Sequence, residues 1–263
     1  MIMTHKRKHE PTQPGNPRAL TIRQHIHSRW SISRFADDDG RVAVLRHGQS
    51  APFLATAEND VFCAKRVWGQ NLEEGLFDKI ERAFHAAVES ILATGSVVDH
   101  RAVTAYLSIW RIRAQLAEQP PADTVLRGIK GSSLSKDEEE ILEKKGYAYA
   151  RPGGTMPGRF GAFIDAHRRH DMTMSRIEGV RWGVLHAKEC EGLVCSDRPG
   201  NELYLPIAPR VVLVAGYRDL DIGAVSVDDL NDSSHRQARD FVFGHPNDVA
   251  ALVARRDSLR TGP

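Results

Sequence analysis

Glu73 is a carboxylate at a position where the surrounding pattern favours an apolar side chain. The segment Asn71–Thr94 predicts a helix with one buried stripe, because apolar residues recur at spacings of three and four: Leu76, Ile80, Phe84, Ala87, Val88 and Ile91. At about 100° per residue, Glu73 falls close to the middle of that stripe. A carboxylate on a core face is costly unless it is paired or hydrogen-bonded. Because Glu73 lies in the first helical turn, the favourable interaction of its negative charge with the helix N-terminus offsets roughly 0.3–1 kcal/mol of that cost. Glu73 is therefore either a structural salt-bridge partner or a member of a polar site at the mouth of the helix.

Two arginines on the next predicted helix, Arg101–Glu118, could supply the partner of Glu73. The apolar stripe of this helix is Val103, Tyr106, Leu107, Trp110, Ala114 and Ala117. Arg111 and Arg113 lie on opposite edges of the stripe, about 80° from its centre. Either side chain could reach a carboxylate such as Glu73 while its stem stays against apolar neighbours.

Other polar residues stand at the ends of apolar segments. Asp197, in the run Ser-Asp-Arg-Pro, follows a short apolar segment and places a carboxylate at the lip of a predicted sheet. Asn231 lies near the inward face of a helix predicted within Val227–Gly244. His167 and Asp171 have the i,i+4 spacing that permits metal ligation, but such pairs occur often by chance, and no metal ligand is assigned to this chain.

The elements that must position these residues predict an α+β fold. Between Arg181 and Gly216, four apolar runs bounded by turn-forming residues indicate consecutive strands of an antiparallel meander: Trp182–Ala187, Leu193–Cys195, Leu203–Ile207 and Val211–Ala215. Further strands are predicted at Arg41–Arg46 and Asp60–Val67, and a third long helix at Arg159–Glu178. We expect a mostly antiparallel sheet of about 4–6 strands, packed against several long helices.

The chain divides into an arm and one domain. Residues 1–20 predict a basic, flexible N-terminal arm, and residues 21–258 a single α+β domain with a variable helical insertion at about 121–158. Within the insertion, Ser135 and Glu138 form a capping-box pattern that predicts a helix over Lys136–Lys145. Its Glu-Glu-Glu and Lys-Lys clusters are typical of a solvated helix face.

Charge is concentrated at the N-terminus. Residues 1–34 hold seven Lys or Arg against one acid, Glu10, although the whole chain carries only +2. Such a segment is either a solvated tail or a phosphate-binding footprint, for which the candidate nucleic-acid-binding residues are Lys6, Arg7, Lys8 and Arg29. The three cysteines form no C-x-x-C pair, which favours reduced thiols in the cytoplasm. No apolar run approaches the roughly 20 residues that span a bilayer, so a membrane partner is not expected.

The segment from Gln24 to Phe35, QHIHSRWSISRF, resembles the opening motif H-H-Y-x-P-x-x-Y-L-x-x-F of the bacterial domain-of-unknown-function family 4238. His25 and Phe35 agree with this motif and Ile32 stands in place of its Leu, while the aromatic Trp30 lies one residue before the position of its second Tyr, which is Ser31 here. The family has His, Tyr and Pro where this chain has Gln24, Ile26 and Ser28.

Later motifs continue the resemblance in the same order, over roughly residues 22–243. The run from Leu72-Glu73 to Glu81 is similar to the family's L-E-x-x-L-x-x-x-E helix, and Arg113 to an arginine of the following helix. Three further matches are Ser196–Pro199, Leu205–Pro209 and Leu230-Asn231. The resemblance implies a short set of site residues: His25, Glu73, Arg113, Asp197 and Asn231.

Two functions are consistent with this set. In the first, the five residues converge on one site of a phosphodiester hydrolase, a nuclease-like enzyme such as a toxin or defence effector. Asp197 and Glu73 are then acid–base groups or ligands of a divalent metal, His25 a proton carrier, and Arg113 a phosphate clamp. The chain contains no recognised nuclease motif and no G-x-S-x-G.

In the second function, the protein is a non-enzymatic binding or assembly module. Glu73 and Arg113 then form a structural ion pair, and Asp197 caps a turn before Pro199. The two hypotheses differ in what they require of Asp197, because only the first needs it beside Glu73 and Arg113.

Overall fold

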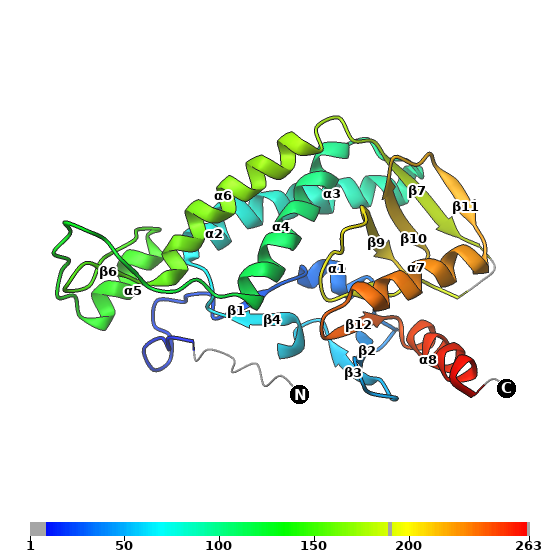
Figure 1. The fold of residues 1–263 in the computed structure, drawn as a ribbon, viewed down its shortest axis with the longest axis horizontal. Helices are drawn as coiled ribbons and strands as arrows, with labels where there is room; N and C mark the ends of the chain where they lie inside the picture. Colours follow the sequence, from blue (N-terminus) through cyan, green and yellow to red (C-terminus); the bar gives the residue numbers. More distant parts are fainter. Residues whose placement is uncertain (1–8, 189–190, 262–263) are drawn as a thin grey trace.

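The computed structural model describes residues 9–188 and 191–261 and confirms the α+β class (Figure 1). A helical layer runs along one side of the molecule, and its main elements are α3 (Asp78–Thr94), α4 (His100–Glu118) and α6 (Gly158–Arg176). α4 packs against both α3 and α6. The insertion with α5 lies at one end of the molecule, and the strand β7 at the other. No helix in the described parts of the chain is long and apolar enough to cross a membrane.

Strands form two four-stranded sheets instead of one meander. The first has the order β11-β7-β10-β9, with bounds Leu220–Ile222, Trp182–Ala187, Val211–Ala215 and Tyr204–Ala208. The second has the order β3-β2-β12-β8, with bounds Phe53–Thr56, Arg41–Arg46, Phe241–Gly244 and Cys195–Ser196. All pairings in these sheets are antiparallel except that of β11 with β7.

The meander prediction is wrong at its second segment, which leaves the first sheet. Cys195 and Ser196 pair with Phe243 and Val242 of β12. Just before them, the Val194 N–H donates to the side chain of Asn231, which removes this group from any strand ladder. The predicted helix Val227–Gly244 is likewise divided. Helix α7 (Ala224–Gln237) ends before Phe241–Gly244, whose aromatic and β-branched residues form the strand β12.

The predicted helix at Asn71–Thr94 is present, with an irregular first part. It begins as α2 (Gln70–Leu72), widens into the π-helical turn η2 (Glu73–Phe77), and continues as α3 until Gly95 at φ 78°. Single π-helical turns within α-helices occur frequently at functional sites. Before this helix, the predicted strand Asp60–Val67 is a 3₁₀ turn, η1 (Asp60–Phe62), followed by the short strand β4 (Cys63–Lys65). β4 pairs with β1 (Arg23–His25).

The insertion contains α5 (Lys136–Lys144) with the predicted capping box, and a small hairpin of β5 (Thr124–Val125) with β6 (Thr155–Met156). The solvated face predicted for the Glu-Glu-Glu cluster of α5 holds for Glu138 but is wrong for Glu139 and Glu140, which are buried, as is Glu143. Glu143 accepts hydrogen bonds from Arg66 and Arg159, and Glu139 from Arg151. Arginines distant in sequence therefore turn an apparently solvated face into a buried ionic contact.

The N-terminal segment packs on this insertion as far as it is described. Glu10 forms ion pairs with Lys136, Arg151 and Arg159 at 2.5–2.7 Å. Burial by itself would raise the pKa of Glu10, but these cations lower it to about 2. Arg18 adds a bidentate contact with Asp137. The division into an arm and a single domain stays a prediction, since residues 1–8 lie outside the described residues.

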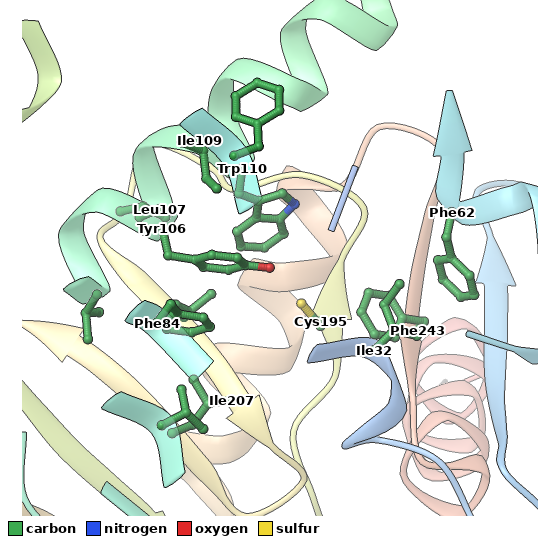
Figure 2. Packing of buried hydrophobic residues seen from close by; sticks show 14 of the residues in the cluster. Ile32, Phe62, Phe84, Tyr106, Leu107, Ile109, Trp110, Cys195, Ile207 and Phe243 are labelled. Carbon is green, nitrogen blue, oxygen red and sulfur yellow. The ribbon is translucent and has the colours of Figure 1, made fainter. Parts of the chain in front are cut away.

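One hydrophobic core joins the helices to both sheets (Figure 2). Tyr106 and Trp110 of α4 and Phe84 of α3 share it with Ile207 of β9 and Phe243 of β12. The rings of Phe84 and Tyr106 stack with their centroids 3.9 Å apart. The helix α1 (Arg29–Ser33) inserts Ile32 into the same core, while α8 (Pro246–Thr261) covers β2 and β12.

Candidate active site

Three of the five residues implied by the family resemblance lie in one cluster. His25 ends β1, Glu73 begins η2, and Arg113 lies in the second half of α4. Electrostatic interactions link Arg113 to both His25 and Glu73. Glu81 of α3 interacts with all three, so the cluster contains a second carboxylate. We call His25, Glu73, Glu81 and Arg113 the acid–base cluster.

Arg113 is the buried centre of this cluster. Its residue exposure is 2%, its Nη1 donates to Glu81 Oε1, and its guanidinium carbon lies 4.4 Å from the centroid of the Phe77 ring. Burial opposes the charge, but the carboxylates of Glu81 and Glu73 more than compensate and raise the pKa of Arg113. The predicted direct ion pair between Glu73 and Arg113 is therefore replaced by one between Glu81 and Arg113, and Glu73 acts on the arginine at longer range.

Glu73 is held by an indole instead of a cation. The Trp68 Nε1–H donates to Glu73 Oε2. Burial raises the pKa of this carboxyl, and the opposing effects of Arg113 and Trp68 do not cancel the shift. A carboxyl group with a raised pKa can deliver a proton nearer to neutral pH than an ordinary glutamate can. The prediction from the helical repeat that the Glu73 side chain points inward is confirmed.

His25 is fixed in one tautomer by its hydrogen bond. The Ala57 carbonyl oxygen can only accept, so the 3.0 Å contact requires that His25 Nε2 carries the proton. The other nitrogen, Nδ1, then holds a lone pair in the neutral ring. Burial lowers the pKa of His25, which keeps the ring neutral at physiological pH. A neutral histidine with an available Nδ1 has the form of a general base.

Cys63 lies directly opposite His25 in the β1–β4 ladder. Burial raises the pKa of its thiol, so the thiolate that a cysteine nucleophile needs is disfavoured. Cys195 is fully buried and cannot serve that role either. A cysteine–histidine mechanism is therefore not supported at this site.

A chain of hydrogen bonds leads from the partly exposed His85 into the core. Ser28 Oγ contacts His85 Nε2 at 3.2 Å and donates to Ser31 Oγ. Tyr106 contacts Ser31 Oγ at 3.4 Å and His27 Nδ1 at 3.0 Å. Burial lowers the pKa of His27 to about 3 and raises that of Tyr106 to about 12, so both groups stay neutral at physiological pH.

Three buried nitrogen atoms around the cluster have no hydrogen-bond partner within the described protein: His27 Nε2, Trp110 Nε1 and Arg113 Nε. The rings of His27 and Trp110 lie 4.5 Å apart by their centroids, and Arg113 interacts electrostatically with His27. Most buried polar atoms in proteins are satisfied, so three unpaired ones in this area are unusual.

Among the described residues, the hydrogen bonds and main electrostatic interactions of Asp197 are with Arg198, Arg239 and Asp240 and not with the acid–base cluster. Its carboxylate accepts the backbone N–H groups of Arg239 and Asp240, both at 2.8 Å. Burial raises the pKa of Asp197, and these two donors only partly oppose the shift. Asp197 thus anchors the turn that leads into β12, which differs from the predicted cap of a turn before Pro199.

Asn231 also has a different setting from the one that the resemblance implies. It is 3% exposed, accepts from Val194 N at 2.8 Å and donates to the Gly192 carbonyl at 2.9 Å. Both bonds hold the segment before β8 in place. The structure therefore brings His25, Glu73 and Arg113 together and gives Asp197 and Asn231 backbone partners elsewhere.

The other residues singled out in the sequence have different settings, as far as the structure describes them. Arg29 is exposed and pairs with Glu58 at 2.8 Å, while Lys6, Arg7 and Lys8 lie outside the described residues. His167 donates through Nδ1 to the Phe163 carbonyl. Within the described residues, no group of three or more His, Cys, Asp or Glu side chains is arranged to hold a metal ion.

Sequence reasoning missed Glu81, His27 and His85 as members of this region. Glu81 had a usable signal, because it lies on the flank of the helical stripe, one residue beyond the last position of the L-E-x-x-L-x-x-x-E motif, which is Ile80 here. His85 follows it by four residues and therefore lies on the same face of α3. Nothing local marks His27, whose burial depends on Tyr106, Trp110 and Phe243 from elements distant in sequence.

Comparisons of the chain with protein-family models, with curated proteins and with solved structures give no match. Fold and site together define an α+β protein with a buried arginine between two glutamates and a neutral histidine. The likeness to family 4238 stays a resemblance of motifs.

Proposed function

We propose that this chain is a phosphodiester hydrolase whose catalytic groups lie in the acid–base cluster. The observation that carries the proposal is the combination of His25, a neutral histidine of fixed tautomer, with Glu73, a carboxyl of raised pKa, around the charge of Arg113. General acid–base cleavage needs one group of each kind. Arg113 and Glu81 each interact electrostatically with both His25 and Glu73, and His25, Glu73 and Glu81 remain partly accessible to solvent.

The proposed step is an in-line displacement at phosphorus. His25 Nδ1 accepts the proton of an attacking water or hydroxyl group, whose oxygen forms the new P–O bond. Glu73 in its protonated form donates its proton to the leaving oxygen as the old P–O bond breaks. Arg113, held by Glu81, supplies fixed positive charge where negative charge develops. The site also offers carboxylate oxygens, the ligand type that a divalent cation such as Mg²⁺ prefers.

Nucleic acid or a nucleotide is the proposed substrate, in the bacterial cytoplasm. The basic residues of the N-terminal arm, with Arg29, support this choice of substrate by their charge. Cys63 and Cys195 are free thiols, which is consistent with a reducing compartment. A role as a toxin or defence effector is an analogy with small nucleases of that kind.

The test is cleavage of labelled single-stranded RNA, single-stranded DNA and duplex DNA by the full chain, with Mg²⁺, with Mn²⁺ and with EDTA. Glu73→Gln keeps an acceptor for Trp68 but cannot act as an acid, and His25→Gln keeps a donor for Ala57 but has no base. Each should lower the rate roughly 10²–10⁴-fold. Glu74→Gln is the matched control, because Glu74 is the exposed neighbour of Glu73 and pairs with Lys144. Wild-type rates in both cluster variants, or no cleavage by the wild type, contradict the proposal.

A second candidate function, a non-enzymatic binding or assembly module, is favoured by the contacts of Arg113. The side chain is 3% exposed, is paired directly with Glu81 and is stacked on Phe77. On this hypothesis Glu81→Gln lowers stability strongly, since it breaks a buried pair at a typical cost of about 3–5 kcal/mol. Glu73→Gln then leaves every measured activity unchanged. Melting temperatures recorded beside the cleavage assay distinguish the two functions.

A further inference from the structure

A basic pocket of about 470 Å³ lies on the opposite face of α4 from the acid–base cluster. Arg111 and Arg113 are two residues apart, so their side chains leave the helix about 200° apart. The pocket lies between α4, residues 198–201 and the end of α7. Its polar lining includes Arg111, Gln115, Arg198, Asn201, Arg236 and Gln237. We call it the arginine pocket.

Positive charge in the arginine pocket is only partly neutralised. Glu118 is its one acidic lining residue within the described chain, and it pairs with Arg198 at 3.4 Å and with Arg239 at 2.7 Å. Arg111 has a different partner: its Nη2 donates to the Gly200 carbonyl at 2.7 Å. Among the residues that the structure describes, neither Arg111 nor Arg236 forms an ion pair with a carboxylate. Burial without a compensating acid lowers the pKa of Arg111.

The pocket wall is built by specific contacts. Asp197 holds the backbone of Arg239 and Asp240, and the next residue, Arg198, donates through Nε to the Gln237 carbonyl at 3.2 Å. Gly200 permits the close approach of this wall, since a Cβ there would lie 1.7 Å from Gln237 Oε1. The guanidinium of Arg198 is therefore positioned before any ligand arrives.

We infer that the arginine pocket binds the phosphate group of a small phosphorylated molecule, a function separate from the proposed cleavage. Three guanidinium groups against one carboxylate leave a formal charge of +2, which matches a phosphate dianion. Arginine forms bidentate hydrogen bonds with phosphate oxygens, and Gln115, Gln237 and Asn201 offer further amide donors. The volume lies within the usual range of small-ligand sites, about 300–1,000 Å³.

Calorimetric titration of the full chain tests this inference, with sodium phosphate, pyrophosphate and adenosine monophosphate as probes in low-salt buffer. Arg111→Gln and Arg236→Gln should each weaken binding at least tenfold. Arg236 is exposed, so its variant should fold even if Arg111→Gln does not. Arg176→Gln changes an exposed helical arginine outside the pocket and should bind like the wild type. Circular dichroism melts confirm that each variant is folded.

The three probes distinguish a nucleotide ligand from a site that recognises phosphate alone. Tighter binding of adenosine monophosphate than of phosphate supports a nucleotide ligand, and equal binding supports recognition of the phosphate group alone. No saturable binding of any probe up to about 1 mM overturns the inference. It is also overturned if Arg176→Gln weakens binding as much as Arg236→Gln does, because the interaction would then follow net charge and not the pocket. Loss of nuclease activity in the cluster variants leaves this measurement unaffected.

Discussion

Arg111 and Arg113 lie two residues apart on α4, and the fold gives them opposite environments. Arg113 turns toward α3, where Glu81 and Glu73 hold a buried charge in place. Arg111 turns toward the 198–201 turn, where it donates to the Gly200 carbonyl and lines the arginine pocket. The same side chain thus serves as a fixed internal cation in one region and as an available anion-binding group in the other. The two environments differ because the arginines point from opposite sides of α4, and because α3 presents a carboxylate where the 198–201 turn presents a backbone carbonyl.

The largest expected effect is on stability, and it should separate the two arginines. Arg113→Met leaves Glu81 and Glu73 without their cation in a buried setting, which we expect to cost about 3–5 kcal/mol. Arg111→Met removes one partly exposed hydrogen bond and should cost less than about 1 kcal/mol. Urea unfolding of both variants measures the difference. Similar losses would show that Arg111 is as structural as Arg113.

An intermediate loss of stability is expected on substitution of Asp197, which we assign to the support of the arginine pocket and not to the acid–base cluster. Asp197→Ala leaves two backbone N–H groups without their acceptor, at a cost of about 1–3 kcal/mol. It should also weaken phosphate binding, because Arg198 loses its support, while leaving the activity of the acid–base cluster intact. Measuring both activities on the folded variant checks the assignment. Loss of cleavage with unchanged phosphate binding would return Asp197 to the catalytic set.

The smallest effect concerns the pH dependence of stability. The pKa of Glu73 is raised in the folded state, so the folded protein binds this proton more tightly than the unfolded chain. Stability should therefore fall as pH rises from the ordinary glutamate value of 4.5 through the raised pKa. Glu73→Gln removes this fall, so the variant should become progressively more stable relative to the wild type as the pH rises. Unfolding free energies measured between about pH 4 and pH 8 test the sign, and a constant difference contradicts it.

Local patterns were informative where spacing alone sets the structure. The stripe from Leu76 to Ile91 predicted a helix and the inward direction of Glu73, because both depend only on the helical repeat. The capping box at Ser135 was equally predictable, since its partners are three residues apart. The placement of Arg111 and Arg113 on opposite edges of one helix followed from the same geometry.

Partners distant in sequence were decided by the tertiary structure. Periodicity could not show that Arg113 pairs with Glu81 and not Glu73, because that choice depends on how α3 and α4 pack. It could not show that Cys195 joins the strand of Phe243 in a second sheet. Glu139 and Glu143 of α5 look solvated by every local rule, but in the folded chain they are buried against Arg66, Arg151 and Arg159.

The sequence by itself therefore determined the helices, their inward faces and a short set of polar residues, because short-range geometry is the same in every fold. The packing of elements decided which of those residues share an environment. It placed His25 and Glu73 with the buried charge of Arg113, and it placed Asp197 against the backbone of Arg239 and Asp240. The energy of a charge depends on its solvation and on its neighbours across space, and neither is encoded in spacing along the chain.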